Sequence, residues 1–376
     1  MNKEKHERPI RVMVVDDSAF MRTAISRMIT SDASLEVAGS ASDGQQALEM
    51  LQQIDPDVIT MDVEMPRMNG LEALRKIMEG TPRPVIMISS VTQEGAQMTL
   101  DALESGAFDY IPKQLSYVSL DIVKIKQDLV NKIKAAAASR RCRTAKIRAT
   151  TPRTTAGHAP LDRLKYPSAS VVCIGTSTGG PKALQRILPM LPAELPAGVV
   201  IVQHMPPGFT GPFASRLNGL CRIRVKEAEQ DDWIEPGTAL IAPAGLQTTI
   251  YRKTHSRFAI RLSTTPSDTL HVPSVDVMML SAAEVLGPMA MGVIMTGMGN
   301  DGERGIKAIQ QAGGFTVGQD EASCAVYGMP RACALGGSLS EVVSLEGIPD
   351  QIVNATRCRP ASTGTVVCPS VGVTRI

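Results

Sequence analysis

The chain has 376 residues, of which 43% are hydrophobic and 20% are charged, and its formal net charge is +2. This length favours two or three domains, and the composition is typical of a folded globular protein rather than a disordered one. A net charge near zero gives no overall attraction to nucleic acid or to an anionic membrane surface. No run of about 18 apolar residues occurs, so we expect no membrane insertion.

The seven cysteines are scattered along the chain, and no two of them form a CxxC pair. Such a pattern favours reduced thiols over a disulfide framework or a zinc site. The first ten residues, MNKEKHERPI, are polar and lack the apolar core of a secretory signal. Together these features predict a cytoplasmic protein.

Short apolar runs alternate with helical patterns over the first part of the chain. The runs have the length of buried strands, and most of them end in polar residues. Alternation at this spacing predicts an α/β fold in which helices cover both faces of a parallel sheet. The expected strands cover residues 10–15, 58–61, 85–88 and 107–111, and the helical patterns end at residue 28 or cover residues 45–53, 71–78 and 97–103.

Three carboxylates stand at the ends of expected strands, Asp16 and Asp17 after the first and Asp62 after the second. The carboxyl ends of parallel strands meet at one edge of a sheet, so we expect these side chains to cluster around a cation such as Mg²⁺. Asp62 is then a candidate nucleophile that forms an acyl phosphate, with Ser89 and Lys113 holding the phosphoryl oxygens. Each residue alone also fits a structural role, such as a helix cap or a solvated lysine.

These residues belong to four longer motifs, VDDSAFMR, DVITMDVEMPRMNGLEAL, VIMISS and GAFDYIPK. Together the motifs resemble the receiver domain of response regulators, and the resemblance covers residues 8–126. It implies a (βα)5 fold, phosphorylation of Asp62 by a histidine kinase, and an aromatic switch at Tyr110. The residues that it assigns to the site are those named above, Asp16, Asp17 and Asp62 for Mg²⁺ and Ser89 and Lys113 for the phosphoryl group.

A basic segment follows the helical pattern at residues 120–138. Between residues 131 and 165 the sequence has ten Lys or Arg residues and a single acid, Asp162. This composition predicts a flexible basic linker at residues 127–167. A nucleic-acid-binding arm is the alternative, but no aromatic residues are interleaved and no recognition helix follows, so we expect no nucleic-acid partner. At the other end of the chain, residues 356–376 show no periodicity, and we expect a loosely ordered tail.

A second α/β pattern begins near residue 168. Its first apolar run leads into Gly175-Thr176-Ser177-Thr178-Gly179, which matches the G-x-S-x-G pattern of a serine nucleophile on a strand-to-helix turn. Amides at the start of the next helix would stabilise an oxyanion there. A glycine-rich anion-binding loop is the alternative, whereas a dinucleotide fingerprint is absent. The expected strands of this domain, which we place at residues 168–355, cover residues 171–175, 199–203, 238–242, 292–296 and 315–317.

A nucleophilic serine needs a base, and His204 is the candidate because it ends the apolar run that follows Ser177. A third group should orient the base, and Asp301 lies in a glycine-rich turn after the strand at residues 292–296. A structural histidine and an ordinary Asp-Gly turn are the alternatives. The chain order Ser, His, Asp differs from the order in ordinary α/β-hydrolases, so we expect a different fold.

The second half resembles the catalytic domain of chemotaxis protein-glutamate methylesterases in the motifs IGTSTGGPKAL, VIVQHMPPGFT, SVDVMMLSAA, GVIMTGMGNDGERG and QDEASCAVYGMPRACALGG. The resemblance implies a Rossmann-like α/β methylesterase domain with Ser177 as nucleophile, His204 as base and Asp301 as the orienting group. It also implies that Thr178 and the backbone of Met298 lie near the oxyanion, and it implies no cofactor. Members of the family remove methyl esters from glutamates of chemoreceptors, and many deamidate receptor glutamines.

Joined together, the two resemblances predict a phosphorylation-activated enzyme whose substrates are methylated chemoreceptors. We expect the unphosphorylated receiver to cover Ser177 until Asp62 is phosphorylated. A response regulator with a DNA-binding output domain is one alternative, but no helix-turn-helix pattern occurs. A catalytically idle scaffold in a chemosensory complex is another. It stays open because Gln247 stands where the family commonly has His, and Val272 where it commonly has Arg.

Overall fold

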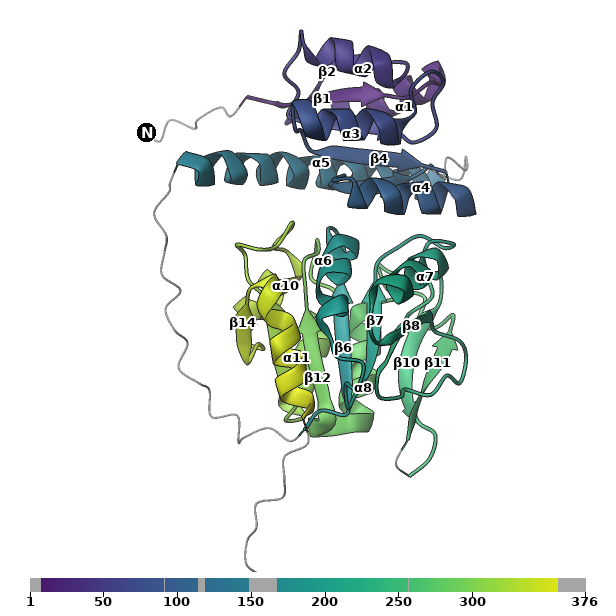
Figure 1. Cartoon of the computed structure of the whole chain (residues 1–376), viewed down its shortest axis with the longest axis vertical. Helices are drawn as coiled ribbons and strands as arrows, with labels where there is room; N and C mark the ends of the chain where they lie inside the picture. Colours follow the sequence, from purple (N-terminus) through teal and green to yellow (C-terminus); the bar gives the residue numbers. More distant parts are fainter. Residues whose placement is uncertain (1–7, 91, 114–118, 149–167, 256, 358–376) are drawn as a thin grey trace, which may run out of the picture.

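The structure, a computed structural model, consists of two α/β units (Figure 1). The N-terminal unit ends with helix α5 (Ser119–Arg148), and the C-terminal unit begins with strand β6 (Val171–Thr176). Among the described residues, no helix is both long enough and apolar enough to cross a membrane. The residues that the structure describes are 8–90, 92–113, 119–148, 168–255 and 257–357, so most of the expected linker and nearly all of the expected tail lie outside them.

The N-terminal unit is a parallel sheet in the order β2-β1-β3-β4-β5, which is the flavodoxin-like doubly wound order. The expected receiver fold is therefore confirmed. Strand β2 was not among the expected strands because only its first and last residues are fully buried. The elements before α5 are β1 (Ile10–Val15), α1 (Ala19–Thr30), β2 (Leu35–Ala41), α2 (Gly44–Leu51), β3 (Val58–Asp62), α3 (Gly70–Gly80), β4 (Val85–Ser89), α4 (Gln93–Glu104) and β5 (Asp109–Pro112).

Side-chain caps fix where the first four helices begin. Ser18, Asp43, Asn69 and Thr92 each precede a helix and accept a hydrogen bond from a backbone N–H in its first turn. These residue types compensate the unpaired amides of a helix start, typically by about 1 kcal/mol. Each cap lies in the loop that follows a strand, so it also sets the length of that loop at the carboxyl edge of the sheet.

Helix α5 reaches well past residue 126, where we expected the receiver domain to end. Its residues Leu129, Val130 and Ile133 are buried in the core beneath the receiver sheet. The first part of the segment expected as a linker, residues 127–148, is therefore helical. Apolar residues at helical spacing hold its first half against the sheet, although the segment is rich in Lys and Arg.

The C-terminal unit has a seven-stranded parallel sheet in the order β14-β13-β12-β6-β7-β9-β8 and a separate antiparallel hairpin, β10–β11. All residues of β6, β7 and β12 are buried, as the central strands of a two-sided parallel sheet should be. The expected α/β fold is confirmed, and the added strands β8 and β14 are short and partly exposed.

The bounds of its elements after β6 follow the chain. They are α6 (Gly180–Ile187), η2 (Leu188–Met190), β7 (Gly198–Gln203), α7 (Thr210–Leu220), β8 (Arg224–Glu227), β9 (Thr238–Ile241), β10 (Gln247–Arg252), β11 (Phe258–Ser263), α8 (Val275–Leu286), η3 (Gly287–Met289), β12 (Ala290–Ile294), α9 (Glu303–Gln311), β13 (Phe315–Gln319), α10 (Met329–Leu335), β14 (Glu341–Val343), η4 (Leu345–Gly347) and α11 (Ile348–Thr356). The first strand, β6, lies between β7 and β12, so the chain reverses its direction across the sheet beside β6. Open α/β sheets bind ligands at such a point.

Candidate phosphorylation site and candidate catalytic site

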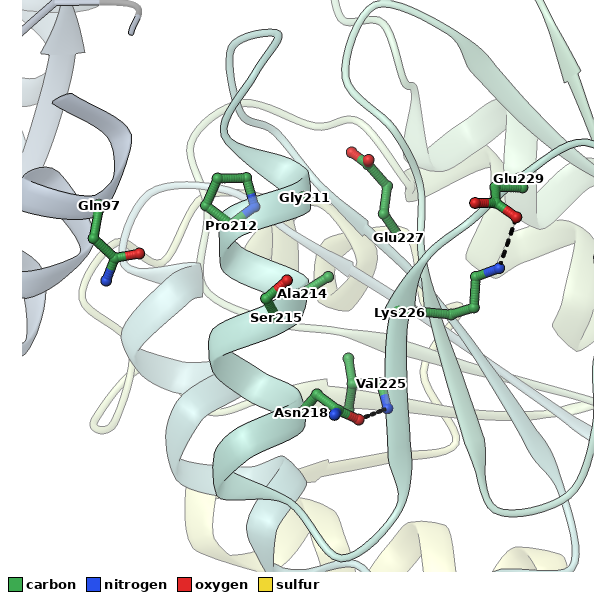
Figure 2. Close-up of a pocket in the computed structure, with 10 residues that line it drawn as sticks. All are labelled: Gln97, Gly211, Pro212, Ala214, Ser215, Asn218, Val225, Lys226, Glu227 and Glu229. Carbon is green, nitrogen blue, oxygen red and sulfur yellow. Dashed lines mark hydrogen bonds and ion pairs between the residues drawn. The ribbon is translucent and has the colours of Figure 1, made fainter. Parts of the chain in front are cut away.

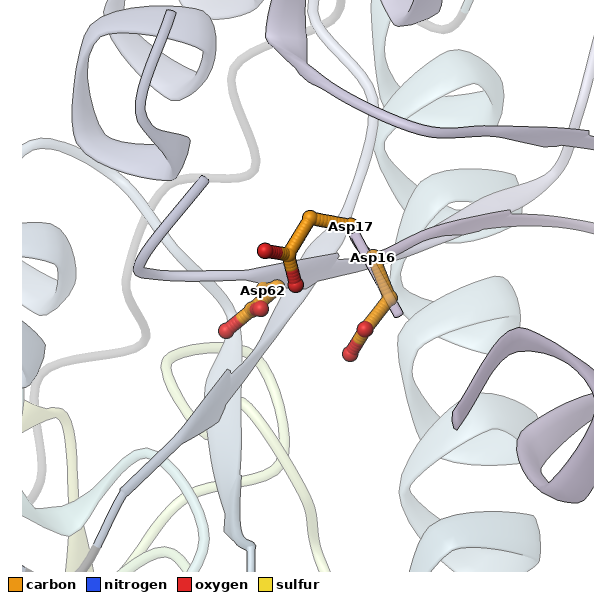
Figure 3. Close-up of side chains that lie close together, drawn as sticks. All are labelled: Asp16, Asp17 and Asp62. Atoms are coloured by element: carbon orange, nitrogen blue, oxygen red, sulfur yellow. The ribbon is translucent and has the colours of Figure 1, made fainter. Parts of the chain in front are cut away.

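The expected acidic cluster is present at the carboxyl edge of the receiver sheet (Figure 3). Oxygen atoms of Asp16, Asp17 and Asp62 lie within 4.8 Å of one another. They meet because β1 and β3 are paired, with Val15 opposite Met61, so both strands end at the same level. Asp17 is exposed, which leaves the cluster open to solvent. A set of carboxylate oxygens with an open side is typical of Mg²⁺ binding in receiver domains.

Lys113 is the counter-ion of this cluster. Its Nζ lies 2.5 Å from Asp62 Oδ2 and 3.2 Å from Asp16 Oδ2. Burial raises the pKa of Asp62 to about 6, and the charge of Asp16 adds to the rise, although the hydrogen bond from Lys113 opposes it. One ammonium group therefore does not fully compensate the crowded negative charge, and a bound cation would relieve it.

Ser89 and Tyr110 occupy different positions relative to this cluster. The Ser89 hydroxyl donates to the carbonyl oxygens of Gly95 (3.1 Å) and Ser90 (3.3 Å), so it is turned towards the start of α4 rather than towards Asp62. The Tyr110 side chain is buried, and its hydroxyl has no hydrogen-bond partner. The Tyr110 ring stacks on Phe209 of the C-terminal unit, with 5.1 Å between ring centroids. Tyr110 thus contacts the other domain directly.

Ser177 stands on the turn between β6 and α6, as the sequence predicts. Its amide donates to Thr296 O (3.0 Å), and its carbonyl accepts from Gly180 N (2.8 Å). Gly179 has a φ of 77°, a left-handed conformation that side chains other than glycine rarely adopt. These contacts hold the serine in a tight turn at the centre of the sheet edge, and its side chain keeps partial exposure.

His204 lies beside this turn on the neighbouring strand. Strands β6 and β7 pair Thr176 with Gln203, so Ser177 and His204 are the next residues on the two strands. The Gln203 Nε2 donates to the carbonyls of Ser177 (3.0 Å) and His204 (2.9 Å) and ties the two turns together. We did not single out Gln203 from the sequence. Its position as the last strand residue before His204 was the available signal.

Asp301 receives hydrogen bonds from four groups. Oδ2 lies 2.8 Å from His204 Nε2 and accepts from Val275 N (2.8 Å), while Oδ1 accepts from Ser274 Oγ (2.8 Å) and Asp276 N (2.9 Å). The carboxylate therefore lies on the amino end of α8, where helix amides favour an anion. Burial raises the pKa of Asp301, but the hydrogen bond with His204 and those from the amides more than offset it, so this pKa lies well below its ordinary value.

An ionised Asp301 determines which nitrogen of His204 carries a proton. A carboxylate only accepts hydrogen bonds, so the neutral imidazole has its N–H at Nε2. Nδ1 is then the nitrogen with a free lone pair, and it is buried without a hydrogen-bond partner. The structure therefore brings His204 and Asp301 into contact and places Ser177 on the adjacent strand end, without a hydrogen bond to Nδ1.

The loop after β12 packs against the serine turn. A Cβ atom at Gly297 would lie 3.0 Å from Ser177 Cβ, so only glycine permits this approach. The next residue is Met298, which is half-buried, and Thr178 is buried on the opposite side of Ser177. Thr178 O accepts a hydrogen bond from Thr296 Oγ1 (2.9 Å), which joins the two loops. The structure thus brings both candidate oxyanion residues to the same edge of the sheet as Ser177.

His271 is a site residue that the sequence analysis passed over. Its ring stacks on His204, with 3.9 Å between centroids and 17° between ring planes. Burial lowers the pKa of His271 to about 4, and the charge of His204 adds to this effect. Two cations could not share this stack without strong repulsion, so His271 stays neutral where His204 accepts a proton. Its place in a loop without periodicity gave no signal in the sequence.

The low pKa of His271 predicts a stability effect. In the unfolded chain histidine titrates near 6.5, so protonation favours unfolding as pH falls from 6.5 towards 4, by at most about 3 kcal/mol. The stabilisation is complete above pH 6.5. We expect His271→Phe, which keeps a ring but does not titrate, to lose less stability between pH 7.5 and pH 5 than the wild type. Unfolding midpoints of both chains at the two pH values measure this, and equal losses would contradict it.

The receiver lies over the carboxyl edge of the catalytic sheet, with α4 and α5 on the side that faces α6 and α7 (Figure 1). Arg216 of α7 forms ion pairs with Asp101 (2.5 Å) and Glu104 of α4. Nearby, burial raises the pKa of Asp109, while the charge of Lys132 and a hydrogen-bonding contact with Thr178 oppose the rise. A receiver carboxyl group therefore lies against the turn that carries Ser177.

A groove of about 700 Å³ interrupts this interface (Figure 2). One wall belongs to α4 of the receiver, and the others belong to α7 and to the segment around β8. The polar lining implies a water-filled gap, and an interface with such a gap holds two domains less firmly than a continuous apolar one. The polar residues of the lining are Gln97, Ser215, Asn218, Lys226, Glu227 and Glu229.

The two folds and their sites define a response regulator whose output domain is an α/β enzyme domain. The family model "Response regulator receiver domain" matches residues 12–122, and "CheB methylesterase" matches residues 172–352. The chain belongs to the CheB family of receiver-linked protein-glutamate methylesterases/protein-glutamine glutaminases.

Three similar proteins represent the comparison. A protein-glutamate methylesterase/protein-glutamine glutaminase of Oleidesulfovibrio alaskensis is 47% identical over 92% of this chain and 99% of its own length. One of Pyrococcus abyssi is 46% identical over 93% and 94% of the two chains. The solved CheB methylesterase catalytic domain of Thermotoga maritima is 36% identical, with a TM-score of 0.48, and the match covers 50% of this chain and 98% of that domain.

Proposed function

We propose that this chain is a phosphorylation-activated protein-glutamate methylesterase that hydrolyses glutamate methyl esters on chemoreceptors and deamidates receptor glutamines. The observation that carries the catalytic part is the His204–Asp301 pair, joined at 2.8 Å beside the turn of Ser177. Membership of the methylesterase/glutaminase family supports the choice of reaction. A Ser177-His204-Asp301 triad is the simplest chemistry that these three side chains support.

The reaction is acyl transfer through Ser177. His204 Nδ1 takes the proton from Ser177 Oγ as the oxygen attacks the glutamyl carbonyl carbon. His204 then gives this proton to the leaving methoxide, and methanol departs from a glutamyl ester on Ser177. Water, deprotonated by His204, attacks that ester and releases the glutamate carboxylate and free Ser177. With a glutamine substrate, ammonia leaves in place of methanol.

Asp301 and the backbone supply the electrostatic part of this reaction. Asp301 stabilises the imidazolium that forms on His204 and holds Nδ1 towards the serine. The carbonyl oxygen becomes an oxyanion in the tetrahedral intermediate, and we assign its stabilisation to Thr178 and to the backbone of Met298. Both flank Ser177 on rigid loops, so little reorganisation is needed when the charge appears.

Control of the activity belongs to the receiver. Asp62 accepts a phosphoryl group from a histidine kinase, and Asp16, Asp17 and Asp62 hold Mg²⁺. When bound, Mg²⁺ offsets the negative charge that gathers around the transferred group. Lys113 pairs with Asp62 before the reaction and is close enough to hold a phosphoryl oxygen after it. Ser89 must turn its hydroxyl away from the start of α4 to take part.

The contacts between the domains support inhibition by coverage. Tyr110 stacks on Phe209, and Asp109 lies against Thr178, so the receiver occupies the space above the serine turn. A receptor helix cannot reach Ser177 while these contacts persist. Phosphorylation of Asp62 would shift the population towards an arrangement in which β5 and α4 have left the catalytic domain.

The test is methanol release from methylated receptor membranes, with and without a small-molecule phosphodonor and Mg²⁺. We expect release to rise with the donor in the wild type. We expect Asp62→Asn to keep the unstimulated rate and to lose the whole response, because an amide cannot form the acyl phosphate. A response that persists in Asp62→Asn would refute the assigned phosphorylation site. No release by any phosphorylated preparation would favour an idle scaffold.

A further inference from the structure

Gln247, the first residue of β10, is fully buried and makes three hydrogen bonds through its side chain. Its Oε1 accepts from Ser274 N (2.9 Å), and its Nε2 donates to Pro266 O (3.0 Å) and Thr269 Oγ1 (2.7 Å). The orientation of the amide is fixed by these partners, since a backbone N–H only donates and a backbone carbonyl only accepts. Both amide hydrogens are used, so the side chain is locked.

One branch of this network leads to Asp301. Ser274 caps α8, and its hydroxyl donates to Asp301 Oδ1 at 2.8 Å. Gln247 holds the backbone of this same residue, which places the start of α8 and the amides that surround Asp301. A shift of Ser274 would therefore move the carboxylate that contacts His204.

The second branch leads to His271. Thr269 accepts from Gln247 and passes its own hydroxyl proton to His271 O, at 2.8 Å. The hydrogen bond to Pro266 O fixes the same loop a few residues earlier. His271 carries the ring that stacks on His204. Gln247 is thus joined, through one residue on each side, to both groups that hold the imidazole of His204.

We propose that Gln247 is a positioning residue that sets His204 from two directions, through Ser274 and Asp301 on one side and through Thr269 and His271 on the other. The proposal rests on the proposed role of His204 as the base. Gln247 touches neither Ser177 nor the substrate, so it acts on the rate of the chemical step and not on binding. Misplacement of a catalytic group by about 1 Å can slow a reaction on the order of a hundredfold.

Two variants of the full chain test this role. Gln247→Met has similar length and flexibility but makes none of the three hydrogen bonds. Gln247→His keeps one donor and one acceptor. Thr316→Val is the matched control, because Thr316 is fully buried in the same domain, donates to Ser338 O (2.8 Å) and accepts from Ser340 N (2.9 Å), away from the histidine pair. It removes buried hydrogen bonds without reaching His204.

Methanol release by phosphorylated enzyme gives kcat and KM. We expect Gln247→Met to lower kcat by roughly ten- to a hundredfold with KM within about twofold, and Gln247→His to recover most of the loss. Thr316→Val should keep both constants within about twofold although its unfolding midpoint also falls. Equal kcat in Gln247→Met and Thr316→Val, or a change confined to KM, would overturn the proposal.

A second readout does not depend on the reaction. The Nε2 proton of His204 in its hydrogen bond to Asp301 should give a downfield proton resonance, identified by its loss in His204→Gln. We expect Gln247→Met to shift or broaden this resonance and Thr316→Val to leave it unchanged. If the wild type releases no methanol, the proposed function fails, and this resonance still decides whether Gln247 positions His204. An unmoved resonance in Gln247→Met would refute the positioning role alone.

Discussion

Ser177→Ala should lower methanol release from methylated receptor membranes by roughly a thousandfold or more, since the attacking oxygen is lost while the base remains. The residual rate would come from water activated by His204 within the same site. Because Ser177 is partly exposed on its turn and its described contacts are made by the backbone, the alanine chain should fold with an unchanged unfolding midpoint.

Ser215→Ala is the matched control for this prediction. Ser215 is an exposed serine on α7 of the same domain, where alanine is well tolerated in a helix. We expect its rate to stay within about twofold of the wild type. Substantial release by Ser177→Ala would mean that the G-x-S-x-G turn is an anion-binding loop and that another group attacks the ester.

The strand ends were predictable because parallel sheets impose a simple rule. Asp16, Asp62, Ser177 and His204 each follow or close a buried strand, and strands of one sheet end at one edge. An apolar run followed by a polar residue is visible without any alignment. The contact of Asp301 with His204 was harder to predict, since the loop after β12 has to fold back onto the start of α8.

The rest of the catalytic site depends on chain paths that leave no local pattern. His271 lies in a loop between β11 and α8, and only the folded path stacks it on His204. Gln247 looked like a departure from the family motif, whereas the structure satisfies its amide completely. Strands β8 and β14 escaped prediction for a related reason, because short, partly exposed strands lack a continuous apolar run.

The domain interface could not be predicted from periodicity at all. Its ion pairs join Arg216 to Asp101 and Glu104, which are more than a hundred residues away in the chain. Each of these side chains, taken alone, reads as part of a solvated helix face. What distinguishes Arg216 is burial, since its side chain is only 17% exposed between the two domains.

Removal of the receiver should raise the unphosphorylated rate. If the open arrangement is populated at about 1–10% in the full chain, deletion of residues 1–165 raises basal methanol release roughly ten- to a hundredfold. The rate should then approach that of the phosphorylated full chain and no longer respond to a phosphodonor. An equal or lower rate, from a fragment whose cooperative unfolding is intact, would contradict inhibition by coverage.

Arg216→Ala tests the same idea without truncation. Ion pairs of this kind contribute about 1 kcal/mol, so their loss should raise the open population and the basal rate roughly fivefold. The rate with phosphodonor should stay unchanged, since Arg216 is remote from the triad contacts. Arg257→Ala is the control, because it removes an ion pair of similar length, 2.8 Å to Glu235, within the catalytic domain alone. A rise in both variants would point to general loosening of that domain, and a rise in Arg216→Ala alone would locate the inhibitory contact at α4 and α7.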